Sequence, residues 1–238
     1  NDMTRLIHFY ILLDCQKFNI NHIKRTLTSI SNQVYKSFSI ILSDNINSEE
    51  EKCIREFMGE KVEIIKKGKL IQHSNTFLIF LNEGSYIREY LLYEYASLLN
   101  ATNSIDLIYT DEMSYYGKSI RKSDYDQLKF HSPFFKPSWS PDYLETFNYI
   151  GYGACFRTSK AEVIDYLNYY DYVLKFTETN VNVKHIKKIL IANDDSFSIS
   201  DSKDTEALSN RLIRTNRDGY VQKIESHNKL MKIIKIEP

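Results

Sequence analysis

Short apolar runs alternate with amphipathic segments along the first half of the chain. The runs have the length and the continuous apolar character of buried strands. The strands that they predict are Leu6–Leu13, Ser37–Ser43, Val62–Ile65, Thr76–Leu81 and Ile105–Tyr109. Between them apolar residues recur at helical spacing, and the helices that this predicts are Ile20–Val34, Ser48–Met58 and Ile87–Leu99. Strands that alternate with helices in this way predict an α/β fold with a mostly parallel central sheet.

Capping residues support two of the predicted helices. Asn19 or Asn21 can accept hydrogen bonds from the first backbone N–H groups of the first helix. Ser48, with Glu51 three residues later, has the pattern of a capping box at the start of the second.

Polar residues directly follow four of the predicted strands. They are Asp14, Asp44-Asn45, Asn82-Glu83 and Asp111-Glu112. Right-handed crossovers place the carboxyl ends of parallel strands at one edge of a sheet, where ligands of such folds bind. The pattern therefore predicts a nucleotide and metal site at that edge. The alternative is that these residues are polar only because the strand ends face water.

Composition excludes several other classes of protein. The chain has 31 basic and 31 acidic residues and a pI near 7.2, whereas a protein that coats nucleic acid is usually basic. Three widely spaced cysteines, Cys15, Cys53 and Cys155, form neither a disulfide framework nor a zinc motif and favour a reducing compartment. No run of about 18 apolar residues is present, so we expect no transmembrane segment. The 18 tyrosines indicate either half-buried surface or a sugar-stacking face.

Several familiar catalytic and phosphate-binding motifs are missing from the sequence. No Gly-x-Gly-x-x-Gly follows the first strand, and no Gly-Lys-Ser/Thr loop is present, so the dinucleotide-binding and P-loop interpretations lack a phosphate cradle. No serine lies in a Gly-x-Ser-x-Gly elbow, and the six histidines do not have the spacing of metal ligands.

A longer pattern lies in the second half of the chain. Its blocks, in order, are Asp106–Met113, Phe135–Asp142, Asn148–Gly151 and Phe156-Arg157. In order and spacing they resemble blocks of the family 2 glycosyltransferases of bacterial surface-polysaccharide and glycoprotein synthesis, which have the GT-A fold. Weaker resemblance extends from about Leu6 to Leu190, through Leu27–Tyr35, Ser39–Asp44, Tyr170–Lys175 and His185–Leu190.

This resemblance implies a Rossmann-like, three-layer α/β/α domain over residues 1–190. Residues 191–238 are then a C-terminal extension, with a predicted helix at Thr205–Ile213 and an edge strand at Leu230–Pro238. The extension is either a linker to a further glycosyltransferase domain or an ordinary edge strand. The family further implies a cytoplasmic bacterial protein, free or peripheral to the inner face of the membrane.

The resemblance also implies substrates and roles. The donor of such an enzyme, a hexosyltransferase, is a nucleotide-sugar, here a UDP-sugar, held with Mn²⁺ or Mg²⁺, and the acceptor is a glycan or glycoprotein. The matching nucleotide-binding positions are Asp14, Asp44 and Asn45, and the matching metal positions are Glu83, Asp111 and Glu112. The catalytic base position is Tyr169, with Asp171 as the nearest carboxylate. The acceptor side is represented by Trp139, Asn148 and Tyr149.

The sequence departs from the family where the donor binds and where transfer occurs. The family's Pro-x-Tyr-Asn is Asp14–Lys17 here, and its Asp-x-Asp-Asp metal motif is Asn82–Ser85. Tyr169 replaces the catalytic aspartate, and Ile191–Asn193 replaces a histidine-tryptophan pair. The segment Gly68–Asn75 is too short for the family's helix before the central strand. We therefore expect a catalytically impaired accessory module. The alternative is an active glycosyltransferase with a rearranged metal and nucleotide site.

Overall fold

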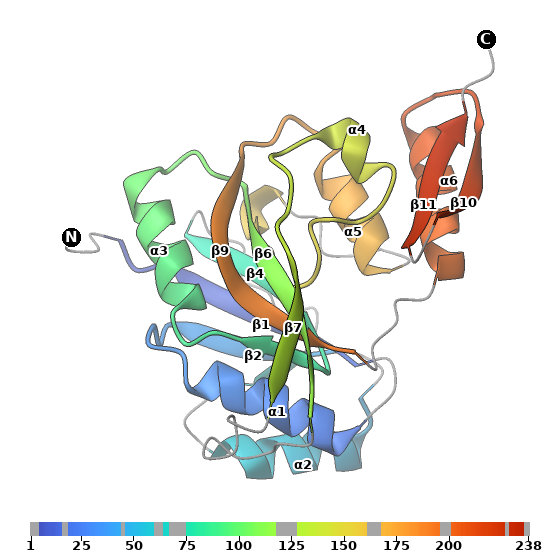
Figure 1. Ribbon diagram of the computed structural model, residues 1–238. Coiled ribbons are helices and arrows are strands. Elements are labelled where there is room, and N and C mark those ends of the chain that lie inside the picture. Colours follow the sequence, from blue (N-terminus) through green and yellow to red (C-terminus); the bar gives the residue numbers. More distant parts are fainter. Residues whose placement is uncertain are drawn as a thin grey trace.

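The computed structural model describes residues 5–15, 19–43, 46–59, 64–66, 75–117, 128–160, 168–195, 201–226 and 229–235 (Figure 1). Its centre is a parallel block of strands formed by the first part of the chain. β1 (His8–Asp14) lies between β2 (Phe38–Leu42) and β4 (Thr76–Asn82), and β3 (Ile64–Lys66) extends the block beyond β2. The apolar runs in the sequence thus predicted these parallel strands. Val62, the first residue of the predicted strand Val62–Ile65, lies outside the described residues.

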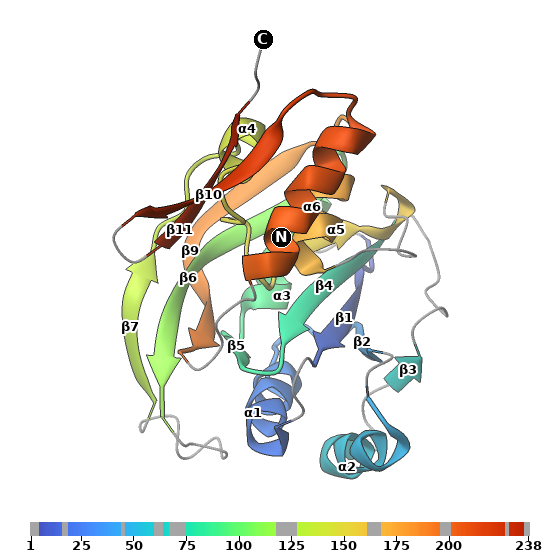
Figure 2. The same ribbon diagram turned by 90° about the vertical axis from the view of Figure 1, so that its right-hand side faces the viewer.

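The second half of the chain completes the sheet with mixed pairings. The added strands are β5 (Ser85–Ile87), β6 (Leu107–Tyr116), β7 (Lys129–Phe134), β8 (Cys155–Arg157) and β9 (Val183–Asp194). The order is β3-β2-β1-β4-β8-β6-β9-β5, with β7 paired to β6. β9 runs parallel to β6, whereas β5, β7 and β8 pair antiparallel with their neighbours. The sheet is curled and mostly parallel, which confirms the predicted fold class (Figures 1 and 2).

The helices form two layers, one on each face of the sheet, and each layer packs on its own hydrophobic cluster. Because side chains alternate along a strand, Phe9 and Ile11 of β1 enter one cluster and Tyr10 and Leu12 enter the other. The first cluster is covered by α1 (Ile20–Ser31), α2 (Ser48–Met58) and α3 (Leu91–Ala101). The second is covered by α4 (Pro141–Leu144), α5 (Tyr169–Phe176) and α6 (Asp201–Arg214). Several tyrosines, among them Tyr149, Tyr169 and Tyr172, are buried in this second cluster.

The structure corrects the predicted capping box of the second helix and the predicted start of the third. The capping box of α2 is formed by Asn47 and Glu50 instead of Ser48 and Glu51, because the Asn47 side chain accepts from the Glu50 N–H while Glu50 accepts from the Asn47 N–H. Of the two caps predicted for α1, Asn19 is the one used. Ile87 does not begin a helix, because it ends β5 opposite Ile191.

The strand predicted at Ile105–Tyr109 is longer than its apolar core. β6 continues to Tyr116 because its second half pairs with β7 on one side and β9 on the other. Asp111 and Glu112 therefore lie within a strand, at irregularities in the β6–β9 register, instead of after its end. Both residues therefore lie on a strand that has β9 on one side and, from Glu112 onward, β7 on the other.

The C-terminal part follows the main sheet. The boundary predicted at Leu190 lies inside β9, and α6 contains the predicted helix Thr205–Ile213. β10 (Tyr220–Ser226) and β11 (Lys229–Lys235) form a separate antiparallel hairpin next to α6 (Figure 2). The described part of the predicted edge strand Leu230–Pro238 therefore belongs to this hairpin. None of the helices in the described ranges has the length and apolar character needed to cross a membrane.

Candidate functional site

Asp111 links three segments of the chain. Its side chain is buried, and its Oδ1 accepts hydrogen bonds from the Lys136 backbone N–H at 2.9 Å and from His185 Nε2 at 2.8 Å. The His185 ring stacks on Tyr109, its register partner, with a centroid distance of 4.5 Å. Asp111 therefore fastens the segment after β7 to β6 and β9.

Glu112 is paired with a buried lysine. The Lys136 side chain is 0% exposed, and its Nζ lies 2.9 Å from Glu112 Oε2 and donates to the Ile150 carbonyl at 2.7 Å. Gly151 follows with φ +66°, and a Cβ at that position would lie 2.6 Å from Glu112 Oε2. The ammonium group thus lies between a strand carboxylate and the backbone of residues 148–154.

Tyr169, at the position where the family resemblance predicts the catalytic base, forms a stacked pair with Tyr152. Their ring centroids are 4.5 Å apart, with an interplanar angle of 16°. Tyr169 Oη donates to the Gly151 carbonyl at 2.6 Å, and Tyr152 Oη donates to Asp14 Oδ2 at 2.8 Å. Burial raises the pKa of Tyr169 well above its ordinary value, so this phenol is neutral at physiological pH.

The turn between β4 and β5 contains the residues that the family resemblance aligns with a metal motif. Asn82 Oδ1 accepts from the Gly84 backbone N–H at 3.0 Å, which closes a tight turn around the buried Glu83. Burial raises the pKa of the Cys15 thiol, and the charges of Glu83 and Asp14 raise it further. Cys15 directly follows β1, and its thiol is protonated at neutral pH.

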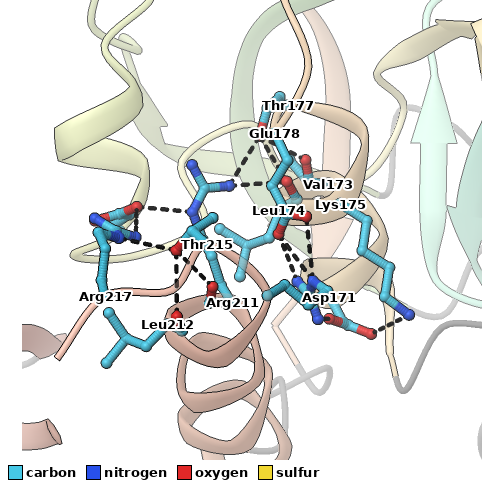
Figure 3. A network of polar contacts seen from close by, with 12 residues as sticks. Asp171, Val173, Leu174, Lys175, Thr177, Glu178, Arg211, Leu212, Thr215 and Arg217 are labelled. Carbon is cyan, nitrogen blue, oxygen red and sulfur yellow. Dashed lines mark hydrogen bonds and ion pairs between the residues drawn. The ribbon is translucent and has the colours of Figure 1, made fainter. Parts of the chain in front are cut away.

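Asp171 lies on a different side of α5 from Tyr169. Its side chain is 2% exposed, and its carboxylate lies 3.1 Å from Arg214 Nη1 and 3.3 Å from Lys175 Nζ (Figure 3). Residues two positions apart on a helix point in nearly opposite directions. The structure therefore brings Tyr169 to Gly151 and holds Asp171 against α6.

Three arginines in and after α6 form a cluster that the sequence analysis missed. Arg211, Arg214 and Arg217 are spaced by three residues. This regular spacing is the one feature of the sequence that indicates the cluster. Arg211 Nε donates to Glu145 Oε1 at 2.7 Å, and Arg217 Nη2 donates to the same oxygen at 2.6 Å. Arg214 binds Glu178 as well as Asp171. This arginine cluster fixes the C-terminal end of α6 to α4 and α5.

We expect the attachment of α6 to weaken in acid. Burial alone would raise the pKa of Glu145, but hydrogen bonds and charges from Arg217 and Arg211 outweigh it and lower that pKa. A carboxylate with a lowered pKa stabilises the fold above its ordinary pKa of 4.5, and this stability is lost as the pH falls through the lowered value. Urea unfolding between about pH 5 and about pH 3 should therefore show a smaller loss of stability for Glu145→Gln than for the unmodified chain. Equal losses would contradict this role.

The predicted acceptor-side residues have structural contacts. Tyr149 is buried, and its hydroxyl accepts from the Ser140 N–H at 2.9 Å and donates to the Ser140 carbonyl at 3.2 Å. Asn148 accepts from the Gly151 N–H at 3.4 Å, and Trp139 packs, partly buried, on the second cluster. The predicted nucleotide positions Asp44 and Asn45 lie outside the described residues.

Comparison with known proteins identifies the fold. No family model matches the chain. The O-antigen biosynthesis protein RfbC of Myxococcus xanthus is 24% identical over 231 residues, and the match covers 84% of this chain but only 17% of RfbC. TarS of S. aureus, solved in complex with UDP-GlcNAc, superposes with a TM-score of 0.60 at 13% identity over 87% of this chain and 67% of that one. The chain has a GT-A glycosyltransferase fold.

Two further GT-A structures carry a metal ion. The mannosyltransferase PcManGT of Pyrobaculum calidifontis, in complex with GDP-Man and Mn²⁺, gives a TM-score of 0.57 at 10% identity, over 92% of this chain and 66% of that one. Glucosyl-3-phosphoglycerate synthase of Mycobacterium tuberculosis, in complex with Mn²⁺ and UDP, gives 0.52 at 7% identity, over 97% and 88%.

The carboxylates of β6 in this GT-A domain do not fit such a cation as they stand. The Lys136 ammonium already lies 2.9 Å from Glu112, and Asp111 accepts two hydrogen bonds from the protein. Within the described ranges, no group of three or more His, Cys, Asp or Glu side chains is arranged to hold a metal ion. Lys136 and His185 lie within the sequence blocks that resemble the family, but nothing in the sequence indicated that they contact Glu112 and Asp111.

Proposed function

We propose that this chain is a GT-A module of bacterial surface-polysaccharide synthesis in which nucleotide-sugar transfer is impaired, and that it acts as an accessory domain of a glycosyltransferase. The observation that carries the proposal is that groups of the protein itself bind the strand carboxylates. Lys136 and His185 contact Asp111 and Glu112 at distances between 2.8 and 2.9 Å. The family blocks and the similarity to RfbC support the process to which the module contributes.

The chemistry of transfer gives the physical reason. A sugar nucleotide needs a cationic group at its leaving diphosphate, and the acceptor hydroxyl needs a base. Tyr169 cannot serve as that base at neutral pH, because it is a neutral phenol whose O–H donates a hydrogen bond to the Gly151 carbonyl. Asp171 is 2% exposed and lies between Arg214 and Lys175, so an acceptor hydroxyl could reach it only if α6 moved.

One observation favours the alternative of an active enzyme with a rearranged site. Asp14 pairs in register with Asn82, and Glu83 directly follows Asn82, so two acidic residues lie at the neighbouring ends of β1 and β4. In that case a UDP-sugar with Mn²⁺ or Mg²⁺ would bind there, with the sugar acceptor on the side of Trp139.

Calorimetric titration separates the two proposals. The chain is titrated with UDP-, GDP- and dTDP-sugars, with and without MnCl₂, after thermal unfolding has shown that it is folded. TarS with UDP-GlcNAc serves as the positive control. We expect no heat of binding from any donor. Metal-dependent binding in the micromolar range, about −8 kcal/mol, that Glu83→Gln abolishes would establish the alternative.

Asp171→Asn tests the assigned role of that residue. Because Arg214 and Lys175 lose their charged partner, we expect the free energy of unfolding to fall by about 2 kcal/mol in urea titrations. Asp142→Asn, an exposed carboxylate in the first turn of α4, is the matched control and should change stability by less than about 0.5 kcal/mol. Equal stability of the two variants, with loss of donor hydrolysis only in Asp171→Asn, would instead identify Asp171 as a base.

A further inference from the structure

The C-terminal arm, defined as α6, β10 and β11, is held firmly by the GT-A domain. Ala207, Leu208 and Leu212 of α6 are buried, and the arginine cluster binds carboxylates of α4 and α5. β10 contacts α6, and Val221 packs on the second hydrophobic cluster. The hairpin that follows α6 therefore lies beside the domain and contacts it through β10 (Figure 2).

The hairpin has an open edge. β10 and β11 are paired over seven residues each, from Tyr220 opposite Lys235 to Ser226 opposite Lys229. In the part of the chain that the structure describes, β11 pairs with β10 and with no other strand. In an antiparallel pair, alternate residues direct their backbone N–H and C=O groups away from the partner strand, so the outer edge of β11 can accept a further strand.

The charges of the hairpin indicate what kind of strand it accepts. Lys223 of β10 lies directly opposite Lys232 of β11 in the register. β11 also begins and ends with lysine, at Lys229 and Lys235, while Glu225 is the one acidic residue of the two strands. The two strands thus carry four lysines and one glutamate in sequence, and this excess of positive charge is complementary to an anionic strand.

We propose that the outer edge of β11 binds an extended acidic segment of a partner polypeptide as a third strand. This inference rests on the accessory role proposed above, and its test contains no nucleotide, so that the two can fail separately. A second copy of the chain is a poor occupant. Two-fold antiparallel pairing along the whole of β11 would place Lys232 opposite its own copy and Lys229 opposite Lys235.

The test measures binding of the full chain to a labelled peptide of alternating glutamate and valine, as long as β11, by fluorescence anisotropy. A peptide of alternating lysine and valine is the probe control. We expect the acidic peptide to bind and Lys232→Glu to weaken it about tenfold. The matched control is Lys203→Glu, the same charge change at an exposed position of α6, which should leave binding unchanged. Circular dichroism and thermal unfolding of both variants check that a loss of binding does not come from a loss of structure.

Amide hydrogen exchange distinguishes the addition of a strand from simple charge attraction, which would not protect alternate amides of β11. If a strand is added, the alternate amides of β11 that face away from β10 become protected when the acidic peptide binds. Binding without this protection would overturn the proposal, as would equal weakening by Lys203→Glu. Binding to phosphatidylserine vesicles in preference to the acidic peptide would also overturn it and would assign the lysines to a lipid surface.

Discussion

Replacing Lys136 with methionine should lower the free energy of unfolding by about 3 kcal/mol. Methionine keeps most of the volume of the lysine stem but removes the ammonium group that lies 2.9 Å from Glu112 Oε2 and donates to the Ile150 carbonyl. The Lys136 side chain is 0% exposed and Glu112 is 22% exposed, so water can only partly replace the lost cation. Urea unfolding followed by tyrosine fluorescence and circular dichroism measures the change.

The control for this prediction is a lysine with a similar partner but more solvent. Lys160 Nζ lies 2.9 Å from Asp106 Oδ2, yet its side chain is 42% exposed. Lys160→Met should therefore change stability by about 1 kcal/mol or less. The double variant Lys136→Met/Glu112→Gln should recover part of the loss, since it leaves no unpaired charge. The prediction fails if Lys136→Met is no more destabilising than Lys160→Met.

Gly153→Ala should lower the free energy of unfolding by a similar amount, about 3 kcal/mol. Gly153 has φ +85°, a conformation that costs a residue with a Cβ strain energy, and its added Cβ would lie 2.1 Å from Ile191 Cδ1. The backbone cannot easily move away. The Gly153 N–H donates to the Phe80 carbonyl at 2.7 Å, and Tyr95 Oη donates to the Gly153 carbonyl at 2.8 Å.

Two further variants separate the backbone strain from the steric clash. Gly59→Ala places a Cβ at φ +66° and ψ −170° with no atom within 4 Å, so its cost, about 1 to 3 kcal/mol, comes from backbone strain alone. Ile191→Val removes the methyl group that the new Cβ would meet. In the double variant Gly153→Ala/Ile191→Val we expect the clash component to disappear, which a double-mutant cycle detects as coupling between the two sites. Strict additivity would show that Gly153 acts through its backbone alone.

The parallel half of the sheet was predictable because its signals are local. A run such as Phe77–Leu81 is apolar at every position, and so short a continuous apolar run is typical of a strand buried on both faces. β5 and β8 have three residues each, too few for any periodicity, and β7 has a largely polar sequence. These strands form because a neighbouring edge offers hydrogen bonds, which no local pattern records.

The candidate site was predictable as a set of positions and not as a set of contacts. The strand pattern singled out Asp111 and Glu112, and the structure places both on β6. Lys136 lies more than twenty residues later, just after β7. It reaches Glu112 because β7 pairs antiparallel with β6 and brings the residues that follow it back to this part of the strand. Pairings of this kind arise from tertiary packing, so a sequence pattern names one partner and leaves the other unidentified.

The position of β9 within the main sheet determines when that sheet can be completed. β9 lies between β6 and β5, although more than sixty residues separate it from the end of β6. While the chain emerges from the ribosome, β5 and one edge of β6 must therefore wait for Val183–Asp194 before they are covered. Contacts between residues so far apart in sequence slow folding, and exposed strand edges favour aggregation in the meantime. A truncation placed before β9 would make that transient state permanent, so any minimal folding unit of this chain must extend at least to Asp194.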